Sequence, residues 1–379
     1  MRNQRYLEPY IDKDLEKKMV FLDGPRQVGK TTLALNLLNQ ASKQHPAYYN
    51  WDILKQRTLI KNLEFAQQEK LIILDEVHKY KRWRTLVKGF YDQHYPQKKL
   101  IVTGSARLDY YRKGGDSLHG RYHYYRLHPL TLGELTTKAS KSDLAQLLKF
   151  GGFPEPFFSG TELNWRRWSL ERTTRVLYED LRDLHRVQEI SLIELLIDAL
   201  PQRVGSPLSV KSLAEDLEVA PQTVESWIQM LENLYYCFRI LPYGPPKVRA
   251  VKKERKLYFW DWSMSPAGGP RFENLVASHL LKYCHFIQDT QGYQMELRFL
   301  RDFDKRECDF VVIKDKKPVF AVECKTGEKT VSPYLKYFRE RSNLSLIYQV
   351  HLGAKDYGSA EKNVRVLPFS TFVNELKLP

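Results

Sequence analysis

The feature that most constrains the fold is a glycine-bounded run near the start of the chain, from Gly24 to Thr32. It follows a short apolar stretch over 19–22 and precedes a stretch with helical apolar spacing over 33–38. A loop of the form G-x-x-x-x-G-K-T between a strand and a helix is typical of phosphate binding. Its glycines let backbone N–H groups turn inward around a phosphate, and the following helix adds the positive end of its dipole. We therefore expect an α/β fold built around a nucleotide phosphate.

The residues of this loop have expected parts in binding ATP and Mg²⁺, the two predicted cofactors. The Lys30 ammonium would reach the β- and γ-phosphates and take part in catalysis, and the Thr31 hydroxyl would ligate Mg²⁺. The predicted phosphate cradle consists of Gly24, Pro25, Arg26, Gln27, Val28, Gly29, Lys30, Thr31 and Thr32.

A continuous apolar run over 71–74 is typical of a parallel strand buried on both faces, and it ends in two acids, Asp75 and Glu76. Carboxylates at the carboxyl end of such a strand face the nucleotide crevice. We expect Asp75 to hold Mg²⁺ through water and Glu76 to act as the general base on the attacking water. An acidic turn without a catalytic role is the alternative.

Two later segments supply residues that would act on the γ-phosphate. A strand over 99–102 runs into Thr103-Gly104-Ser105-Ala106, and Ser105 is preferred to Thr103 as the side chain beside the γ-phosphate. Both could instead cap the turn. Arg121 precedes an aromatic strand and is expected to reach the γ-phosphate of a neighbouring subunit, with pairing to a surface carboxylate as the equal alternative.

The charge of the chain favours a polyanion as partner. Sixty Lys and Arg against 45 Asp and Glu give a formal charge of +15, which suits DNA before acidic lipid, although ordinary basic surface is the alternative. The four cysteines form no C-x-x-C pair, so neither a zinc site nor a disulfide framework is indicated. No apolar run reaches the roughly 20 residues of a membrane span, so we expect no membrane partner and a cytoplasmic location.

The middle of the chain is predicted to be helical. The stretch 163–200 has the spacing expected of a lid over the nucleotide, and two short helices over 209–217 and 221–231 have helix-turn-helix spacing. A second helix of this kind enters the major groove of DNA, whereas Glu225 and Glu232 would repel phosphates, so a packing role is the alternative. The groove-compatible side chains are Gln222, Thr223 and Gln229. The basic, proline-rich segment that follows, 242–256, is either a strap for nucleic acid or a solvated connector.

The last third combines an acidic helix with three strands. Glu273 lies on a predicted helix over 271–281, and Asp309 begins the second strand. Glu323 and Lys325 lie two apart on the third strand and therefore share a face. Asp309 and Glu323 would bind a divalent metal that activates water on a phosphodiester, with Lys325 as a catalytic cation. Edge charges paired with Lys325 and Arg306, or a fold kept for binding alone, are the alternatives.

Several motifs in one order resemble a known family. G-P-R-Q-x-G-K-T-T, the L-D-E strand end, T-G-S-A, S-L-x-G-R and L-H-P-L followed by Glu134 together resemble AAA+ ATPases of the archaeal-type and signal-transduction branch. These carry an added C-terminal domain of uncertain function, and 151–156 resembles the start of their lid. The resemblance implies an oligomerising ATPase, a ring being one form, with Arg172 and Arg175 as candidates for a second sensor arginine. The helix-Glu, strand-Asp, E-x-K order is similar to the core of restriction-endonuclease-like nucleases, and this resemblance implies that Glu273 joins Asp309 and Glu323 as a metal ligand.

The predicted fold is therefore α/β, a P-loop AAA+ parallel sheet with a helical lid, a winged-helix-like middle domain and a C-terminal restriction-endonuclease-like domain. The expected domains are 1–150, 151–246 and 247–379, the last including the basic linker. The predicted function is Mg²⁺-dependent ATP hydrolysis coupled to binding or remodelling of DNA, branched DNA included, with optional metal-dependent cleavage. The alternative is a nucleotide-controlled switch for a protein partner, with a silent nuclease-like domain.

Overall fold

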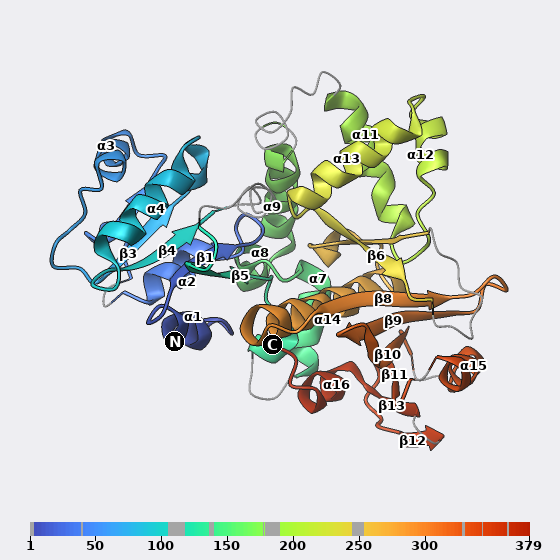
Figure 1. Cartoon of the computed structure of the whole chain (residues 1–379). Helices are drawn as coiled ribbons and strands as arrows, with labels where there is room; N and C mark the ends of the chain where they lie inside the picture. Colours follow the sequence, from blue (N-terminus) through green and yellow to red (C-terminus); the bar gives the residue numbers. More distant parts are fainter. Residues whose placement is uncertain are drawn as a thin grey trace. The chain divides into compact units, whose positions relative to one another are not determined.

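The computed structural model describes residues 4–38, 41–104, 118–135, 140–176, 178, 190–244, 254–327, 330–342, 344–361 and 364–379. The chain divides into two compact units, residues 1–128 and residues 129–379, and each has its own sheet (Figure 1). We expected a first domain that ends at residue 150. The structure ends the first unit at His128, directly after the last strand of its sheet.

The first unit contains a parallel sheet of five strands in the order β2-β3-β4-β1-β5. The strands are β1 (Met19–Asp23), β2 (Tyr48–Asn50), β3 (Leu71–Asp75), β4 (Lys99–Thr103) and β5 (Tyr122–Arg126). The helices are α1 (Glu8–Asp14), α2 (Lys30–Asn36), α3 (Leu54–Asn62), η1 (Val77–Lys79) and α4 (Trp83–His94). Because all five strands run the same way, the phosphate loop after β1 and the polar ends of β3 and β4 meet at one edge of the sheet. This α/β fold confirms the predicted P-loop sheet.

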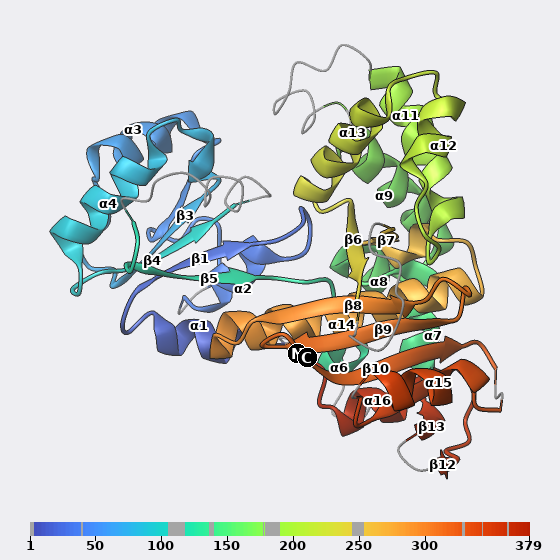
Figure 2. The same ribbon diagram turned by 45° about the vertical axis from the view of Figure 1, so that its right-hand side comes forward.

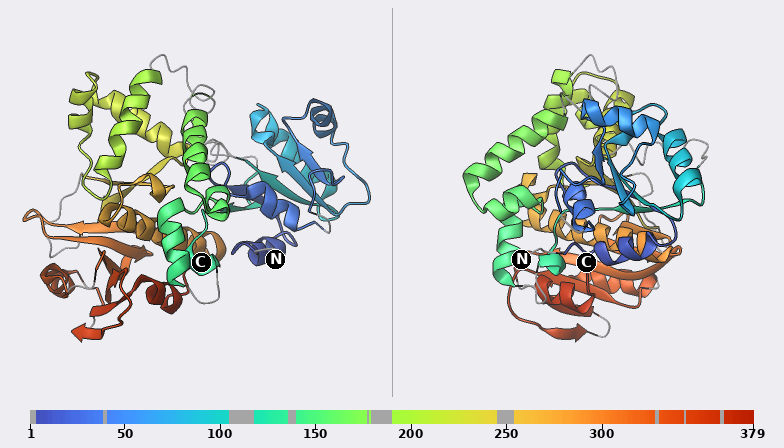
Figure 3. Two further views of the ribbon diagram at one scale, coloured as in Figure 1. Left: turned by 180° about the vertical axis from the view of Figure 1, so that it is seen from behind. Right: turned by 90° about the vertical axis from the view of Figure 1, so that its left-hand side faces the viewer.

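The second unit begins with helices. They are α6 (Leu132–Leu135), α7 (Lys141–Phe150), α8 (Pro154–Ser159), α9 (Glu162–Arg175), α11 (Ile190–Ala199), η4 (Leu200–Arg203), α12 (Val210–Asp216) and α13 (Pro221–Asn233). The helices of 141–175 follow one another in contact, green in Figure 3. The predicted helix pair is present as α12 and α13. Ser209 caps α12 by accepting a hydrogen bond from the Ser212 N–H, and Pro221 stands in the first turn of α13, where its missing N–H costs nothing.

A sheet of eight strands forms the rest of this unit, in the order β12-β13-β11-β10-β9-β8-β6-β7. The strands are β6 (Cys237–Pro242), β7 (Lys256–Phe259), β8 (Met295–Arg301), β9 (Glu307–Lys314), β10 (Lys317–Lys325), β11 (Ile347–His351), β12 (Gly358–Glu361) and β13 (Val364–Pro368). The helical elements are η5 (Trp262–Met264), α14 (Gly269–Gln291), α15 (Pro333–Arg341) and α16 (Phe369–Glu375). α14 lies along β8, β9 and β10 (Figure 2), and α15 packs Leu335 and Phe338 into a core with Val311 and Ile313.

The strand expected as the wing of a winged helix belongs to this large sheet. β6 pairs with β7 on one side and runs parallel to β8 on the other. The expected boundary at residue 246 therefore passes through one sheet, because backbone pairing joins segments on both sides of it. Among the described residues, no helix has the length and apolar character needed to cross a membrane.

Candidate functional site

The phosphate loop has the backbone that its glycines predict. Gly24 has φ 140° and Gly29 has φ 100°, both in the left-handed region that favours glycine. A Cβ at Gly24 would lie 2.3 Å from the Leu127 carbonyl oxygen, so no larger residue fits there. α2 then begins at Lys30, with Gly29 as its N-cap.

The Lys30 side chain folds back into this loop. Its Nζ donates to the carbonyl oxygens of Gly24 at 2.8 Å and Pro25 at 2.7 Å, and the residue is buried. Burial lowers the pKa of Lys30, while the carboxylates of Asp23, Glu76 and Asp75 act in the opposite direction. The ammonium is thus held inside the loop, where phosphate oxygens could replace the carbonyl oxygens as its acceptors.

Three hydroxyl groups donate hydrogen bonds to the Asp75 carboxylate at the end of β3. Thr31 donates to its Oδ2 at 2.9 Å, Tyr48 donates to the same oxygen at 2.7 Å, and Thr103 donates to Oδ1 at 2.5 Å. Burial and the nearby Asp75 carboxylate raise the pKa of Tyr48, so its hydroxyl remains a donor. The Thr31 hydroxyl and the Asp75 carboxylate are the hard oxygen ligands that Mg²⁺ prefers, and they lie side by side as its binding requires.

Glu76 has an unusual backbone and an unsatisfied carboxylate. Its φ is 57°, in the left-handed region, and its N–H donates to the Thr103 carbonyl oxygen at 3.0 Å. Its Oε2 is buried and accepts no hydrogen bond within the described residues, although Nε2 of His78 and Nζ of Lys79 each lie 3.6 Å away. Such strain is typical of functional positions.

The candidates for the γ-phosphate fall in different places. Ser105 lies outside the described residues, and Thr103, the residue weighed against it, is bound to Asp75. Arg121 directly precedes β5, and its carbonyl oxygen accepts from the Met19 N–H at the start of β1. Because the phosphate loop follows the other end of β1, Arg121 lies at the opposite edge of the sheet. Its Nη2 is 3.4 Å from Oδ1 of Asp92.

Two residues that the sequence analysis did not identify, Arg5 and Asp23, hold the phosphate loop in place through hydrogen bonds. Arg5 is buried, and its guanidinium donates to the carbonyl oxygens of Val28 at 2.7 Å and His128 at 2.6 Å. Asp23 is fully buried and accepts from the Gly24 N–H at 2.7 Å. Arg5 has no spacing signal, because its contacts lie 23 and 123 residues away, whereas Asp23 directly precedes the loop in the sequence.

The candidate second sensor Arg172 is committed to the core of its own unit. It is buried, its guanidinium lies 4.6 Å from the centre of the Phe153 ring, and it donates to the Tyr235 carbonyl oxygen at 3.2 Å. The other candidate, Arg175, lies in the last turn of α9.

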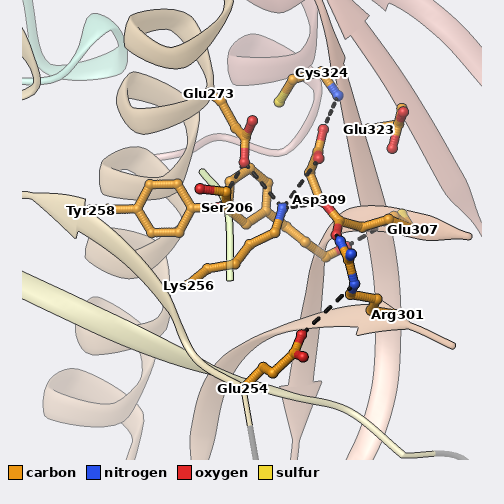
Figure 4. Close-up of polar contacts among 12 residues, drawn as sticks. Ser206, Glu254, Lys256, Tyr258, Glu273, Arg301, Glu307, Asp309, Glu323 and Cys324 are labelled. Carbon is orange, nitrogen blue, oxygen red and sulfur yellow. Dashed lines mark hydrogen bonds and ion pairs between the residues drawn. The ribbon is translucent and has the colours of Figure 1, made fainter. Parts of the chain in front are cut away.

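The predicted residues of the C-terminal site come together from α14, β9 and β10 (Figure 4). Glu273 accepts from the Tyr258 hydroxyl at 2.7 Å, and Oδ2 of Asp309 accepts from the Cys324 N–H at 2.8 Å. Lys325 donates to Oε1 of Glu323 at 2.6 Å, which is one of the ion pairs weighed as an alternative. Arg306 pairs instead with Asp302 and Asp304.

Two of these carboxyl groups resist ionisation. Burial, and then the charge of Asp309, raise the pKa of Glu273 to about 7 and that of Glu323 to about 8. Oε2 of Glu323 is buried and accepts no hydrogen bond within the described residues.

A lysine from the basic segment lies among these carboxylates. Nζ of Lys256 is 2.5 Å from Oε1 of Glu307, 3.3 Å from Oε1 of Glu273 and 3.5 Å from Oδ1 of Asp309, and the side chain is fully buried. Sequence reasoning missed both Lys256 and Glu307. In the part of the chain that the structure describes, no group of three or more His, Cys, Asp or Glu side chains is arranged to hold a metal ion. Because the buried Lys256 ammonium already lies 3.3 Å from Oε1 of Glu273 and 3.5 Å from Oδ1 of Asp309, these residues as arranged do not fit a divalent metal ion.

The two acids of α13 are paired. Arg239 on β6 reaches Glu225 at 2.7 Å and Glu232 at 2.8 Å, and its side chain is only 2% exposed. The exposed residues of the helix include Gln222, Ser226 and Gln229, which carry no charge. Most of the basic segment, 245–253, lies outside the described residues.

Comparison with known protein families gives a match that covers most of the first unit. Residues 16–136 match a family model described as an AAA domain, which confirms the resemblance in the N-terminal part of the chain. Residues 141–267 and 268–372 match models described as domains of unknown function, DUF8612 and DUF4143, and neither description names a nuclease.

The curated relatives span most of the chain. The uncharacterized protein MJ1637 of Methanocaldococcus jannaschii is 23% identical, with 97% of this chain and 86% of the relative covered. A second protein of that organism, the uncharacterized MJ1544, is 21% identical over 87% of this chain and 81% of the relative.

Solved structures give weak likenesses. The Aeropyrum pernix Orc1 protein in complex with DNA is 13% identical, covers 68% of this chain and 90% of its own, and has a TM-score of 0.36. The Thermotoga maritima RuvB Holliday junction branch migration motor is 15% identical, covers 62% of this chain and 87% of its own, and has a TM-score of 0.31. These scores are too low to carry over a function, a substrate or an assembly state.

Proposed function

We propose that this protein is a Mg²⁺-dependent ATPase whose hydrolysis cycle is coupled to the binding or remodelling of DNA. One observation carries the ATPase proposal. A buried lysine in a glycine-bounded loop, a hydroxyl–carboxylate pair and an unsatisfied carboxylate all lie at one edge of one parallel sheet. They are Lys30, Thr31 with Asp75, and Glu76.

The chemistry follows from the position of each group. Thr31 and Asp75 would hold Mg²⁺, Asp75 through water, and the bound ion would offset the negative charge of the phosphates. Glu76 would accept a proton from water as the water oxygen attacks the γ-phosphorus and the bond to the bridging oxygen breaks. Lys30 would transfer its hydrogen bonds from the loop carbonyl oxygens to the β- and γ-phosphates. Tyr48 and Thr103 would keep Asp75 in position.

A catalytic role for Arg121 would require a homo-oligomer, whereas its 3.4 Å contact with Asp92 is the surface pairing expected as the equal alternative. Because this residue precedes β5, at the edge of the sheet away from the loop of its own chain, it can serve as a catalytic cation only for a neighbouring subunit. A homo-oligomer, a ring being one form, would place it beside a neighbour's γ-phosphate.

The DNA part of the proposal depends on charge. The chain carries a formal charge of +15, and phosphate contacts dominate affinity for DNA. Repulsion by Glu225 and Glu232, the objection to α13 as a recognition helix, is weakened because Arg239 pairs with both acids and Arg255 lies 3.5 Å from Glu225. The exposed side chains of Gln222 and Gln229 suit hydrogen bonds to base edges.

Cleavage of DNA by the second unit is not included in this proposal. Asp309, Glu323 and Lys325 lie on neighbouring strands as that chemistry requires, but Lys256 stands beside Asp309. Metal-dependent cleavage would need that place for a metal ion.

A nucleotide-controlled switch for a protein partner is the second candidate. It is favoured by large apolar side chains exposed on α8 and α9, namely Phe158 (60%), Leu163 (66%) and Leu170 (71%). Exposed apolar side chains of this size are more typical of protein contacts than of DNA contacts.

Two assays on the wild-type chain test the proposal. ATP hydrolysis should require Mg²⁺ and stop with EDTA, which tests the ATPase part alone. Binding of linear, single-stranded and four-way-junction DNA should fall steeply as salt rises, because basic side chains displace counterions. Hydrolysis without DNA binding at low salt would favour the protein switch, and no hydrolysis in the presence of Mg²⁺ and DNA would contradict the ATPase itself.

A further inference from the structure

We infer that Lys256 is the resident cation of the acidic centre in the second unit, so that this centre closes around an ammonium group and takes no divalent metal ion. The centre comprises Glu273 on α14, Glu307 and Asp309 on β9, and Glu323 on β10 (Figure 4). The inference concerns the second unit alone and does not depend on ATP hydrolysis.

The place of the ammonium is the first argument. Nζ of Lys256 lies within 3.5 Å of an oxygen from each of Glu273, Glu307 and Asp309. Burial alone would lower the pKa of Lys256, but these three carboxylates outweigh it and raise the pKa, so the side chain remains charged. A divalent ion that used the same oxygens would have to lie close to this positive charge.

The second argument is that most of the carboxylate oxygens already have partners, with Oε2 of Glu323 as the exception among the described residues. Oε2 of Glu307 accepts from Arg301 at 2.6 Å, while Oδ2 of Asp309 accepts the Cys324 N–H. Oε1 of Glu323 accepts from Lys325 at 2.6 Å. Lys256, Arg301 and Lys325 together supply three positive charges for the four carboxyl groups. The centre therefore has little charge left for a metal ion to balance.

The third argument is that the protein backbone covers the centre on the side of Glu273. Gly205 has φ 75°, and a Cβ at this position would lie 2.9 Å from Oε2 of Glu273, so the backbone packs directly on that carboxylate. The Gly205 N–H donates to the Leu257 carbonyl oxygen at 3.3 Å, and the Leu208 N–H donates to that of Arg255 at 2.8 Å. Figure 4 shows Ser206 beside Glu273. A phosphodiester cannot approach Glu273 from this side.

A structural role follows for the centre. Lys256 begins β7, which the segment 204–208 flanks, and its carboxylate partners lie on α14 and β9. The ammonium therefore links the start of β7 to α14 and to β9, as a metal ion does in a structural metal site. The nuclease-like arrangement of Asp309, Glu323 and Lys325 is retained around a cation that the chain itself provides.

Binding of Mn²⁺, followed by electron paramagnetic resonance on the nucleotide-free full chain, tests this inference. The Asp309→Asn variant should bind as much Mn²⁺ as the wild type. Any Mn²⁺ bound near Thr31 and Asp75 should remain bound in that variant. Lys256→Met should gain one Mn²⁺ per chain, more than about tenfold tighter than any wild-type binding at this centre, because a unit charge a few ångströms away is removed. Lys256→Met combined with Asp309→Asn should lose it again.

Lys211→Met is the matched control, since it removes a lysine that is 82% exposed on α12 and should gain no Mn²⁺. A wild-type Mn²⁺ site that both Asp309→Asn and Glu323→Gln abolish would overturn the inference. This arm decides the question even if Lys256→Met does not fold. A folded Lys256→Met protein that gains no Mn²⁺ would also count against it.

Discussion

Three hydroxyl groups converge on the Asp75 carboxylate, and only one of them belongs to the phosphate loop. Thr31 is the expected Mg²⁺ ligand, whereas Tyr48 and Thr103 come from β2 and β4. Asn50 in turn donates to the Tyr48 hydroxyl at 3.2 Å. The carboxylate is therefore oriented before any ion binds, and partners of this kind tune metal affinity from outside the ligand shell.

Tyr48→Phe should weaken Mg²⁺ binding without removing a ligand. We expect the Mg²⁺ concentration for half-maximal ATP hydrolysis to rise about tenfold, because Asp75 loses a hydrogen bond that fixes its orientation. Titration of hydrolysis with Mg²⁺ measures this. Tyr49→Phe is the control, since its hydroxyl accepts from the Ala66 N–H instead. Equal effects of the two substitutions would contradict the role of Tyr48.

Glu323 should make the stability of the second unit dependent on pH. Burial and Asp309 raise its pKa from 4.5 to about 8, although Lys325 acts in the opposite direction. The folded chain then retains a proton that the unfolded chain releases, so this group's contribution to stability is full below about pH 4.5 and is lost as pH rises toward 8.

We therefore expect the Tm of the wild type to fall between pH 5 and pH 8.5 by several degrees more than that of Glu323→Gln, which stays neutral. Thermal melts across this pH range measure the difference. The exposed Glu215→Gln serves as control and should follow the wild type. Parallel profiles for the wild type and Glu323→Gln would show that Glu323 ionises normally.

At the scale of elements, apolar and aromatic patterns were sufficient to predict β1, β3, β4 and β5 of the first sheet, the α12–α13 pair and the three strands β8, β9 and β10. It could not predict that β6 joins β8, because that pairing links segments more than fifty residues apart. Lys256 is a clearer example of a residue whose position the sequence could not predict. In sequence it ends a run of basic residues that is typical of solvated linkers, and only the pairing of β7 with β6 turns its side chain inward.

Arg239→Ala should destabilise the second unit strongly, because it leaves Glu225 and Glu232 without their buried partner. We expect a loss of about 1.5–3 kcal/mol in the free energy of unfolding, because Glu225 is 43% exposed and keeps Arg255 as a partner. Lys211→Ala breaks an exposed pair with Glu215 and should change the same quantity by less than about 0.5 kcal/mol. Chemical denaturation compares the two, and similar losses would show that Arg239 is not a structural centre.

At the scale of the whole molecule, a catalytic role for Arg121 requires neighbouring subunits to share catalytic residues. Arg121→Ala should lower hydrolysis while ATP affinity stays nearly unchanged, because Arg121 would act on a neighbour's γ-phosphate. Mixing Arg121→Ala with Lys30→Ala should restore part of the activity, since some interfaces then contain both intact groups. No recovery, in a protein that remains monomeric with ATP, would remove the role in trans.

The central claim is that Lys30, Thr31, Asp75 and Glu76 bind and hydrolyse Mg²⁺-ATP. It is tested most directly by measuring ATP binding and steady-state hydrolysis in wild type, Lys30→Ala and Glu76→Gln. We expect Lys30→Ala to lose ATP binding or hydrolysis. Glu76→Gln should bind ATP normally but turn over about 10²-fold or more slowly, because the amide cannot accept the proton of the attacking water. Unimpaired hydrolysis in either variant would contradict the account.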